Sequence, residues 1–330
     1  MSGAGFGRLN RTKRDVTTFL RFVAHGLRED IRNGRSFDFL SSEIKAKTLR
    51  LKAEKVRRRF DALNTPDYRG EFSPAILGDV DVLSLCHAAQ VAEQKLCILS
   101  FLRHVGTPRR WTIVSDGSLT ASHAASLRAL YPSVVDLALW TDFICDENRE
   151  CVREFSKYTK FAKKLALESN LPFDRATIYI DSDVVFFEGG HQLRNLLANL
   201  QGRSFYQQDL PGLYDPLIVT AEETKLPPVN AGFVILGKRF DWSEPLARLR
   251  NVLEGLTAAQ GATDLEKLEQ GTAHVAHVIN SSVPLDGRYI LQISDRFLDG
   301  DAYSGPASVM RHYVRPVRHK MWTHASQYVR

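Results

Sequence analysis

Residues 177–190, with the sequence TIYIDSDVVFFEGG, place two acids inside an apolar run. The preceding Ile178, Tyr179 and Ile180 form a continuous apolar segment, which is typical of a strand buried on both faces in a parallel sheet. Burying a carboxylate without a partner is costly or forces its protonation. Asp181 and Asp183 therefore indicate a cation shared by both carboxylates. In α/β sheets ligands gather outside the carboxyl ends of the strands, so the position also suits a binding site.

The Asp-x-Asp pattern is weak evidence on its own, because the chain contains three such triplets, at 79–81, 181–183 and 299–301. Position separates them. Asp79 and Asp81 lie where we expect a strand to start, and Asp299 and Asp301 lie in a glycine-containing loop that we expect to be a solvated turn. Only the central pair ends an apolar strand. Hard oxygen ligands at this spacing suit Mg²⁺ or Mn²⁺.

Alternating strand and helix patterns predict an α/β fold with a mostly parallel sheet and right-handed crossovers. The 330 residues, 44% hydrophobic and 25% charged, exclude a disordered or fibrous chain. We expect a boundary near residue 75, between an N-terminal arm at 1–74 and one domain at 75–330. The expected strands lie at 80–86, 111–115, 134–140, 178–180, 204–207 and 232–236, and the expected helices at 90–105, 122–131, 146–169, 191–200, 246–256 and 265–279.

Positive charge is concentrated at the N-terminus. Residues 1–60 contain sixteen Lys and Arg against six Asp and Glu, a net +10, which leaves −4 for the remainder of the total of +6. Helices are expected at 15–32 and 41–63, the second with an apolar stripe of Leu49, Val56, Phe60 and Leu63. Either this arm docks on the domain with a solvated basic face, or it binds an acidic membrane surface or a polyanionic acceptor. Nucleic acid is a weaker alternative, because no nucleic-acid motif accompanies the charge.

The apolar segments are too short for a membrane span of about 20 residues, and the first residues lack the apolar block of a signal peptide. We therefore expect a cytoplasmic protein, peripherally membrane-associated if the arm binds a bilayer. The cysteines Cys86, Cys97, Cys145 and Cys151 have no CxxC spacing, which favours buried thiols over a disulfide or a zinc site.

Several separated segments resemble motifs of nucleotide-sugar glycosyltransferases with the GT-A fold, and more narrowly of glycosyltransferase family 8 and its bacterial relatives. IYIDSDVV resembles the metal-binding strand of that family. The other segments are YTKF at 158–161, NAG at 230–232, EQ at 269–270 and HYVRPVR from residue 312. The resemblance spans residues 80–322 and excludes the arm. Where the late family motif has glycine and lysine, this chain has Arg315 and Arg318.

The resemblance implies a Rossmann-like single domain and a metal-dependent hexosyltransferase that uses a nucleoside-diphosphate sugar. UDP is the expected nucleotide, retention of configuration the expected outcome, and a carbohydrate, lipid or protein the expected acceptor. Mn²⁺ or Mg²⁺ would be held by Asp181, Asp183 and His312. The implied catalytic residues are Asp209, Glu269 and Gln270, and the implied donor-binding residues are Cys86, His87, Asp116, Lys160, Ser182, Asn230, Ala231, Gly232 and Arg318.

Ordinary structural roles stay open for several of these residues. His312 is also compatible with a surface position in a basic tail, Asn230 with a turn, Lys160 with a solvated helix face, and Glu269 with a helix start. Two other functions also stay open. The sequence DSDVV fits a phosphatase of the haloacid dehalogenase type, although that motif normally lies on the first core strand. A non-catalytic protein that recruits an anionic partner through its basic arm fits the charge distribution.

Overall fold

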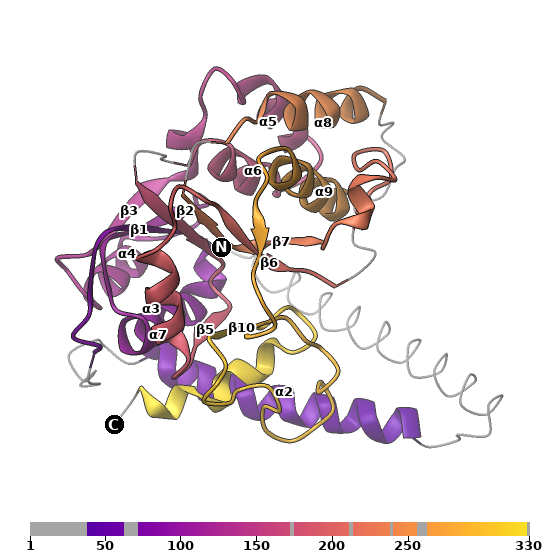
Figure 1. The fold of residues 1–330 in the computed structure, drawn as a ribbon. Coiled ribbons are helices and arrows are strands. Elements are labelled where there is room, and N and C mark those ends of the chain that lie inside the picture. The colour runs from indigo at the N-terminus through magenta and orange to yellow at the C-terminus, as the bar shows by residue number, and fades with distance from the viewer. Residues whose placement is uncertain are drawn as a thin grey trace, which may run out of the picture.

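A twisted seven-stranded sheet lies at the centre of the computed structural model, which describes residues 38–62, 72–171, 175–210, 214–237, 240–255 and 263–328 (Figure 1). The strand order is β3-β2-β1-β4-β7-β6-β8, and within the described residues only β7 runs against its neighbours. The predicted mostly parallel α/β fold is confirmed. The strands are β1 Ile76–Cys86, β2 Thr107–Ser115, β3 Val135–Leu139, β4 Ala176–Ile180, β6 Phe205–Gln208, β7 Val229–Leu236 and β8 Val283–Pro284.

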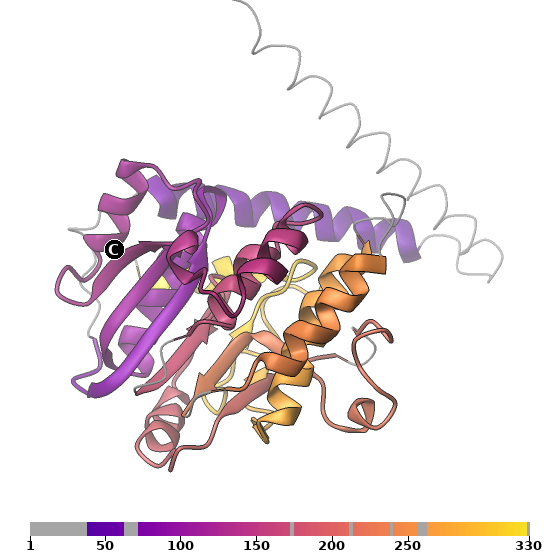
Figure 2. The same cartoon turned by 90° about the horizontal axis from the view of Figure 1, so that it is seen from above.

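Helices cover both faces of the sheet (Figures 1 and 2). Alternation along β4 explains the two layers: Ile178 and Ile180 pack with α3, α4 and α7, whereas Tyr179 packs with α5, α6, α8 and α9. The α-helices are α2 Asp38–Ala62, α3 Val91–His104, α4 Ala121–Arg128, α5 Arg149–Ser156, α6 Ala162–Glu168, α7 Gly190–Leu197, α8 Ser243–Gly255 and α9 Thr263–Ile279. Short 3₁₀ turns are η2 Ala88–Gln90, η3 Trp140–Phe143, η4 Glu223–Lys225, η5 Arg318–Thr323 and η6 Ala325–Gln327.

The single helix expected at 146–169 is wrong, because the chain turns between α5 and α6. Thr159 Oγ1 accepts a hydrogen bond from the backbone N of Phe161 at 3.3 Å. Such local side-chain bonds compete with helical hydrogen bonding. No glycine or proline marks the turn, so the apolar spacing extended the prediction across it. The break lets α6 approach the end of β4 separately from α5.

Helix α2 packs along the domain with one narrow face. Ala46, Ala53 and Phe60 are buried, whereas Val56, placed in the predicted apolar stripe, is 37% exposed. The alanines, and not Val56, face the domain, because small side chains allow α2 to lie close to η5 and α3. The predicted helix at 15–32, the stripe residue Leu63 and most of the predicted boundary at 66–74 lie outside the described residues. None of the described helices is long and apolar enough to cross a bilayer.

The four cysteines are free thiols. Cys86, Cys97 and Cys151 are buried, as the sequence predicted, and Cys145 is half-buried. Burial raises the pKa of the Cys86 thiol and of the Cys151 thiol to about 12. Both thiols are therefore protonated and inert near neutral pH.

A second, three-stranded sheet begins where β4 ends. It has the order β5-β10-β9, with β5 at Val184–Phe186, β9 at Tyr289–Ile290 and β10 at Met310–His312. Strand β10 is antiparallel to β5, and His312 is paired with Val184. The ladder continues with a hydrogen bond from Tyr313 N to Asp183 O at 2.8 Å. This pairing carries a late segment of the chain to the end of β4.

The other two Asp-x-Asp triplets have structural environments. Strand β1 begins at Ile76, so Asp79 and Asp81 lie within it and not at its start. Asp81 accepts a hydrogen bond from Arg109 Nε at 2.9 Å. The third triplet is divided, because Asp299 has a side chain 77% exposed whereas the side chain of Asp301 is 1% exposed. The prediction that Asp301 lies in a solvated turn is wrong.

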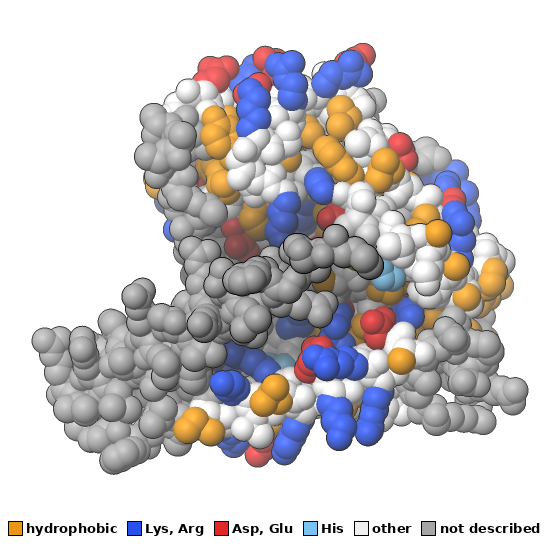
Figure 3. Space-filling model, turned by 180° about the vertical axis from the view of Figure 1, so that it is seen from behind, with side chains coloured by type: hydrophobic (Ala, Val, Ile, Leu, Met, Phe, Trp, Pro, Cys, Tyr) orange, Lys and Arg blue, Asp and Glu red, His pale blue; other side chains and the backbone are white. Residues whose placement is uncertain are grey.

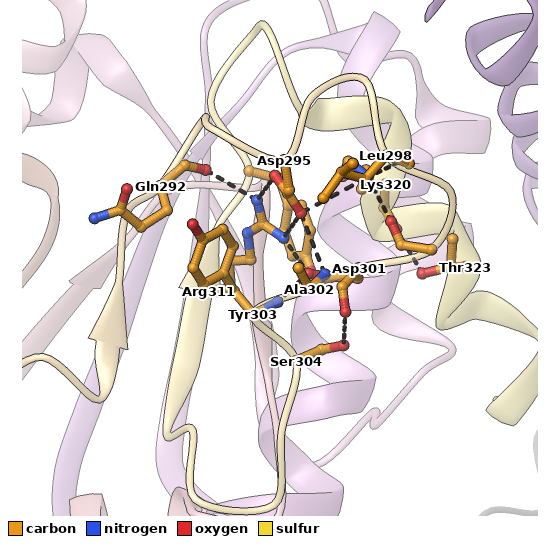
Figure 4. A network of polar contacts seen from close by, with 12 residues as sticks. Gln292, Asp295, Leu298, Asp301, Ala302, Tyr303, Ser304, Arg311, Lys320 and Thr323 are labelled. Carbon is orange, nitrogen blue, oxygen red and sulfur yellow. Dashed lines mark hydrogen bonds and ion pairs between the residues drawn. The ribbon is translucent and has the colours of Figure 1, made fainter. Parts of the chain in front are cut away.

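Asp301 belongs to a buried polar network around Arg311, which is fully buried (Figure 4). Arg311 donates to Asp295 Oδ1 at 2.7 Å, to Asp295 Oδ2 at 2.9 Å and to Gln292 O at 2.9 Å, and it also pairs with Asp301. Lys320 Nζ donates to Leu298 O at 2.8 Å. No local sequence pattern predicts this network, since its charges are separated by loops and meet only when the loop at 292–304 folds against β10.

Candidate metal centre

Asp181, Asp183 and His312 lie together at the carboxyl end of β4. One ligand atom from each lies within 4.8 Å of the others. His312 Nε2 is 3.2 Å from Asp183 Oδ1 and 3.8 Å from Asp181 Oδ2. The grouping follows from the backbone, because Asp181 and Asp183 flank the passage from β4 to β5 and His312 faces them across the β5–β10 ladder. The three residues proposed from sequence as metal ligands are thus brought together.

The tautomer of His312 is set by the partners of Nδ1, on the side of the ring that faces away from the two aspartates. His312 Nδ1 lies 3.0 Å from Asn230 Oδ1 and 3.3 Å from Gln207 Oε1. Asn230 Oδ1 also accepts from Gly232 N at 2.9 Å, and Gln207 Nε2 donates to Tyr289 O at 3.3 Å, so both amides present oxygen to the ring. The proton is therefore held on Nδ1. Nε2 is left to face the two carboxylates, which is the arrangement of a metal-ligating histidine with its supporting acceptor.

Gly232 packs directly against the three candidate ligands. A Cβ at this position would lie 2.3 Å from His312 Cε1 and 2.7 Å from Asp181 Oδ2. Its backbone also joins β7 to the site, since Asp181 N donates to Gly232 O at 2.8 Å. The absence of a side chain at residue 232 is therefore required for His312 and Asp181 to approach each other.

Asp183 uses its two oxygens for different partners. Oδ1 faces His312, and Oδ2 accepts from Arg318 Nε at 2.9 Å. Burial alone would raise the pKa of Asp183, but His312 and Arg318 hold it below its ordinary value. Conversely, burial would lower the pKa of His312, but Asp183 and Asp181 raise it. Arg315, the other departure from the family motif, is exposed and has no positive φ that would require glycine.

Lys164 is a site residue that sequence reasoning missed. Its Nζ lies 3.6 Å from Asp181 Oδ2, 3.4 Å from Glu269 Oε1 and 3.8 Å from Glu168 Oε1. Burial would lower the pKa of Lys164, but the three acids raise it, so the ammonium keeps its charge. Tyr179 OH donates to Asp181 Oδ1 at 2.6 Å. The available signal was a lysine between the apolar residues of α6.

Glu269 and Gln270 lie in the second and third turns of α9 and not at its start, as the sequence had suggested. Glu269 is 1% exposed and faces Lys164, and burial raises its pKa. Gln270 Oε1 accepts from Ala231 N at 3.3 Å, which attaches the helix to the Asn230–Gly232 segment. Both residues therefore face the interior of the site.

Asp209 follows β6 and is half-buried. Burial raises the pKa of Asp209, while Leu210 N and the side chain of Asn230 act against this effect by hydrogen bonding. Asn230 therefore joins Asp209 to His312. Ser182 is only 2% exposed, which leaves its side chain little access to a ligand.

A second group lies at the adjacent ends of β1 and β2. Asp116 N donates to Cys86 O at 3.2 Å, and Lys163 Nζ donates to Asp116 O at 2.5 Å and lies 3.7 Å from Asp116 Oδ2. Burial would raise the pKa of Asp116, but Ser118, Lys163 and His87 lower it. Burial lowers the pKa of His87. The charge of Asp116 raises it, but the charges of Lys160 and Arg318 lower it further. The exposed Lys160 is therefore near this group, while Lys163 makes its direct contact.

No protein-family model matches the sequence, and no curated protein matches it. Solved structures do. The chain is similar to the galactosyltransferase LgtC in complex with donor and acceptor sugar analogues, at 13% identity and a TM-score of 0.49, covering 76% of this chain and 96% of that one. It is similar to mouse xyloside xylosyltransferase 1 at 13% identity and a TM-score of 0.44, covering 72% and 99%.

A third similar structure is the glycosyltransferase GlyE of Streptococcus pneumoniae, at 14% identity and a TM-score of 0.45, covering 74% of this chain and 59% of that one. All three are glycosyltransferases, the class that the sequence resembles. Membership of family 8 stays a prediction. At these identities and TM-scores, the function of this chain rests on the chemistry of its own site.

Proposed function

We propose that the chain is a metal-dependent glycosyltransferase that moves a hexose from a nucleoside-diphosphate sugar to a carbohydrate, lipid or protein acceptor. UDP is the proposed nucleotide and retention the proposed outcome. The observation that carries the proposal is the group of Asp181, Asp183 and His312, with His312 Nε2 turned toward both carboxylates. Two carboxylates and an imidazole suit Mn²⁺ or Mg²⁺.

The charges around the triad leave room for a divalent cation. Four carboxyl groups meet there with two permanent cations: Asp181, Asp183, Glu168 and Glu269 with Lys164 and Arg318. Within the described residues, neither carboxylate oxygen of Glu168 accepts a hydrogen bond, and Glu168 and Glu269 share the single ammonium of Lys164. Such an excess of buried acid is relieved by protonation or by a bound cation. When bound, the metal would stabilise the charge that develops on the leaving diphosphate.

We expect the nucleotide and the hexose of the donor to bind in two neighbouring regions, on either side of the triad. The backbone at Cys86, whose side chain is fully buried, and the side chains of His87 and Asp116 are the proposed contacts for the base and ribose, with Lys160 and Lys163 near the phosphates. Arg318 donates to Asp183 and lies close enough to His87 for its charge to lower the pKa of that imidazole. A guanidinium at this position could bind a diphosphate. Asn230, Gly232, Asp209 and Gln270 lie on the other side of the triad, where the hexose would bind.

The proposed roles of the chain's residues are mainly positional and electrostatic. Lys164 holds Asp181 and Glu269 in one place, and Asn230 fixes the His312 ring. Such positioning lowers a barrier because the charged groups need not reorganise during the reaction. Asp209 is half-buried whereas Glu269 is buried, so Asp209 is the proposed catalytic carboxylate with the freer access to an acceptor.

The phosphatase alternative requires a nucleophilic aspartate with acids around its metal. Within the described residues the group that could hold a metal contains histidine as its third member, and β4 follows three other strands of the sheet in the chain. Both observations favour the transferase.

The test is a thermal-shift panel of UDP-, GDP- and dTDP-sugars, each with and without Mn²⁺, followed by measurement of nucleotide release. We expect stabilisation by a UDP-sugar only with Mn²⁺, and slow metal-dependent release of UDP. Hydrolysis of generic phosphate esters without donor turnover would support the phosphatase instead. Failure of every nucleotide to bind would support a non-catalytic protein.

A further inference from the structure

Helix α2 has an outer face on which aliphatic and basic side chains form two parallel rows along the helix axis. We define this outer face as Ile44, Leu51, Lys52, Lys55, Arg58 and Arg59. Ile44 and Leu51 are seven residues apart and therefore lie on one line along the helix, which continues through Lys55 and Arg58. Ile44 is 54% exposed and Leu51 is 65% exposed. Lys52 and Arg59 form a parallel line at the same spacing.

The charge of the outer face is not neutralised by the rest of the described chain. Arg58 pairs with Glu54 at 3.0 Å, but Lys52, Lys55 and Arg59 have no ion pair within the described residues. Figure 3 shows blue Lys and Arg side chains, with some orange hydrophobic ones between them, along the edge of the molecule that α2 forms. The two exposed aliphatic side chains, Ile44 and Leu51, therefore share this face with three cations that have no ion pair in the described part of the chain.

The opposite face of α2 is fixed to the domain. Phe60 packs against Trp322 with ring centroids 5.7 Å apart, and Arg57 Nε donates to Glu93 Oε1 at 2.7 Å. Trp322 belongs to η5, the same 3₁₀ segment that begins with Arg318. The outer face is therefore attached rigidly to the segment whose first residue reaches Asp183.

We propose that the outer face of α2 binds an anionic membrane surface. Lys and Arg are attracted to acidic headgroups, while Ile44 and Leu51 enter the boundary between headgroups and acyl chains. Nucleic acid would use the cations but gain nothing from exposed aliphatics, and no aromatic side chain for base stacking is exposed among residues 44–62. This inference goes beyond the proposed function and does not depend on it.

The experiment is co-sedimentation of the full chain with vesicles of phosphatidylcholine alone and of phosphatidylcholine mixed in equal parts with phosphatidylglycerol. We expect binding only to the mixed vesicles. Lys52→Gln/Arg59→Gln should lower the partition coefficient about 25-fold, since each basic residue near such a surface contributes about fivefold. The matched control is Arg149→Gln/Arg153→Gln on α5, which makes the same change in net charge at the far side of the molecule (Figure 1) and should leave binding near wild type.

The aliphatic contribution has its own matched pair. Leu51→Ser should lower the partition coefficient about tenfold, because it removes apolar surface that the bilayer would otherwise bury. Leu217→Ser, at a side chain 66% exposed in the wild type, should change it little. Urea unfolding confirms that all four variants are folded.

Two outcomes would overturn the proposal. Equal binding by the α2 and α5 variants would place the membrane contact elsewhere or show that it is nonspecific. Loss of binding in the charge variant, with Leu51→Ser behaving as Leu217→Ser does, would show that the aliphatic side chains do not enter the bilayer and that the vesicle contact is a purely electrostatic attraction to anionic groups.

Discussion

Two buried clusters of acids and bases lie on opposite sides of β10, and they differ in their balance of charge. His312 points toward the candidate metal centre, while its neighbour Arg311 points into the polar network of Figure 4. The network has two acids and two permanent cations: Asp295 and Asp301 with Arg311 and Lys320. The candidate metal centre has four acids and two permanent cations.

The comparison teaches that burial of an acid does not by itself indicate function. Where each buried carboxylate has a matching cation, the cluster completes the fold and needs nothing further. Where acids exceed cations, several carboxylates share one ammonium, as Asp181, Glu168 and Glu269 share Lys164. That excess is a property of a site that receives an additional positive charge.

The same substitution in the two Asp-x-Asp triplets gives the sharpest test. Asp183→Asn should lower metal-dependent release of UDP from a UDP-sugar by at least about 10³-fold, because it removes a ligand and a charge that the metal requires. Its free energy of unfolding in urea should fall by about 1–3 kcal/mol, because Arg318 and His312 lose the charged partner whose pKa they hold low. Full activity in this variant would show that Asp183 holds no metal.

Asp301→Asn should lower stability without lowering metal-dependent release of UDP, because Asp301 lies outside the candidate metal centre. Removing one acid from the balanced network leaves Arg311 without a full complement of charge, which should reduce the free energy of unfolding by about 3 kcal/mol. Asp299→Asn is the control. Because that carboxylate is exposed, the substitution should leave the free energy of unfolding nearly unchanged. If Asp301→Asn unfolds like the control, the distinction between the two clusters is wrong.

Gly232→Ala should damage the candidate metal centre through shape alone. The new methyl group would overlap His312 Cε1 and Asp181 Oδ2, so the ligands must separate, at a cost of about 1–3 kcal/mol in stability. We expect Mn²⁺-dependent thermal stabilisation to disappear. Gly255→Ala, at a position with nothing within 4 Å of an added Cβ, is the matched control. Retention of the Mn²⁺ effect in Gly232→Ala would place the metal elsewhere.

Asn230→Ala should weaken Mn²⁺ binding about 10–100-fold by removing the acceptor that fixes the His312 ring. Titration of Mn²⁺ by calorimetry in the presence of UDP measures the change. Gln208→Ala, on neighbouring β6, removes an amide that bonds Leu285 O and does not contact His312. Identical Mn²⁺ affinities in the two variants would contradict the role given to Asn230.

The balanced network should also produce a dependence of stability on acid. Burial would raise the pKa of Asp301, but His324, Tyr313 and Arg311 hold it below its ordinary value. A depressed folded-state pKa contributes stability above the unfolded value of about 3.9, and this contribution is lost as pH falls further. Thermal midpoints should therefore fall less steeply below pH about 4 in Asp301→Asn than in wild type. Parallel curves would show that Asp301 does not contribute.

Much of the fold followed from periodicity. The apolar runs and their spacing located the principal strands, and the order of strands and helices predicted a mostly parallel sheet. The turn between α5 and α6 was missed because a threonine side chain, and no glycine or proline, makes it. Neither the reversal of β7 nor the exposure of Val56 has a local signal, because both depend on which segments pack together.

The candidate site was predictable where a residue type was unusual for its surroundings. Asp181 and Asp183 interrupt an apolar strand, and His312 was proposed through the family resemblance. Lys164 was missed because a lysine on an amphipathic helix is ordinary unless the facing acids are known. Asp301 was misinterpreted for the same reason, since its partners Arg311 and His324 come from β10 and from the residue after η5, which the loop sequence does not reveal.

The position of β10 has a consequence for how the protein becomes active during synthesis. All seven strands of the central sheet precede β10 in the chain. A ribosome-bound chain that ends before residue 310 can already contain the sheet and both aspartates, but it has neither His312 nor Arg318. Completion of the candidate metal centre therefore waits for one of the last segments to be translated, and a shorter chain holds the two aspartates without the histidine that faces them.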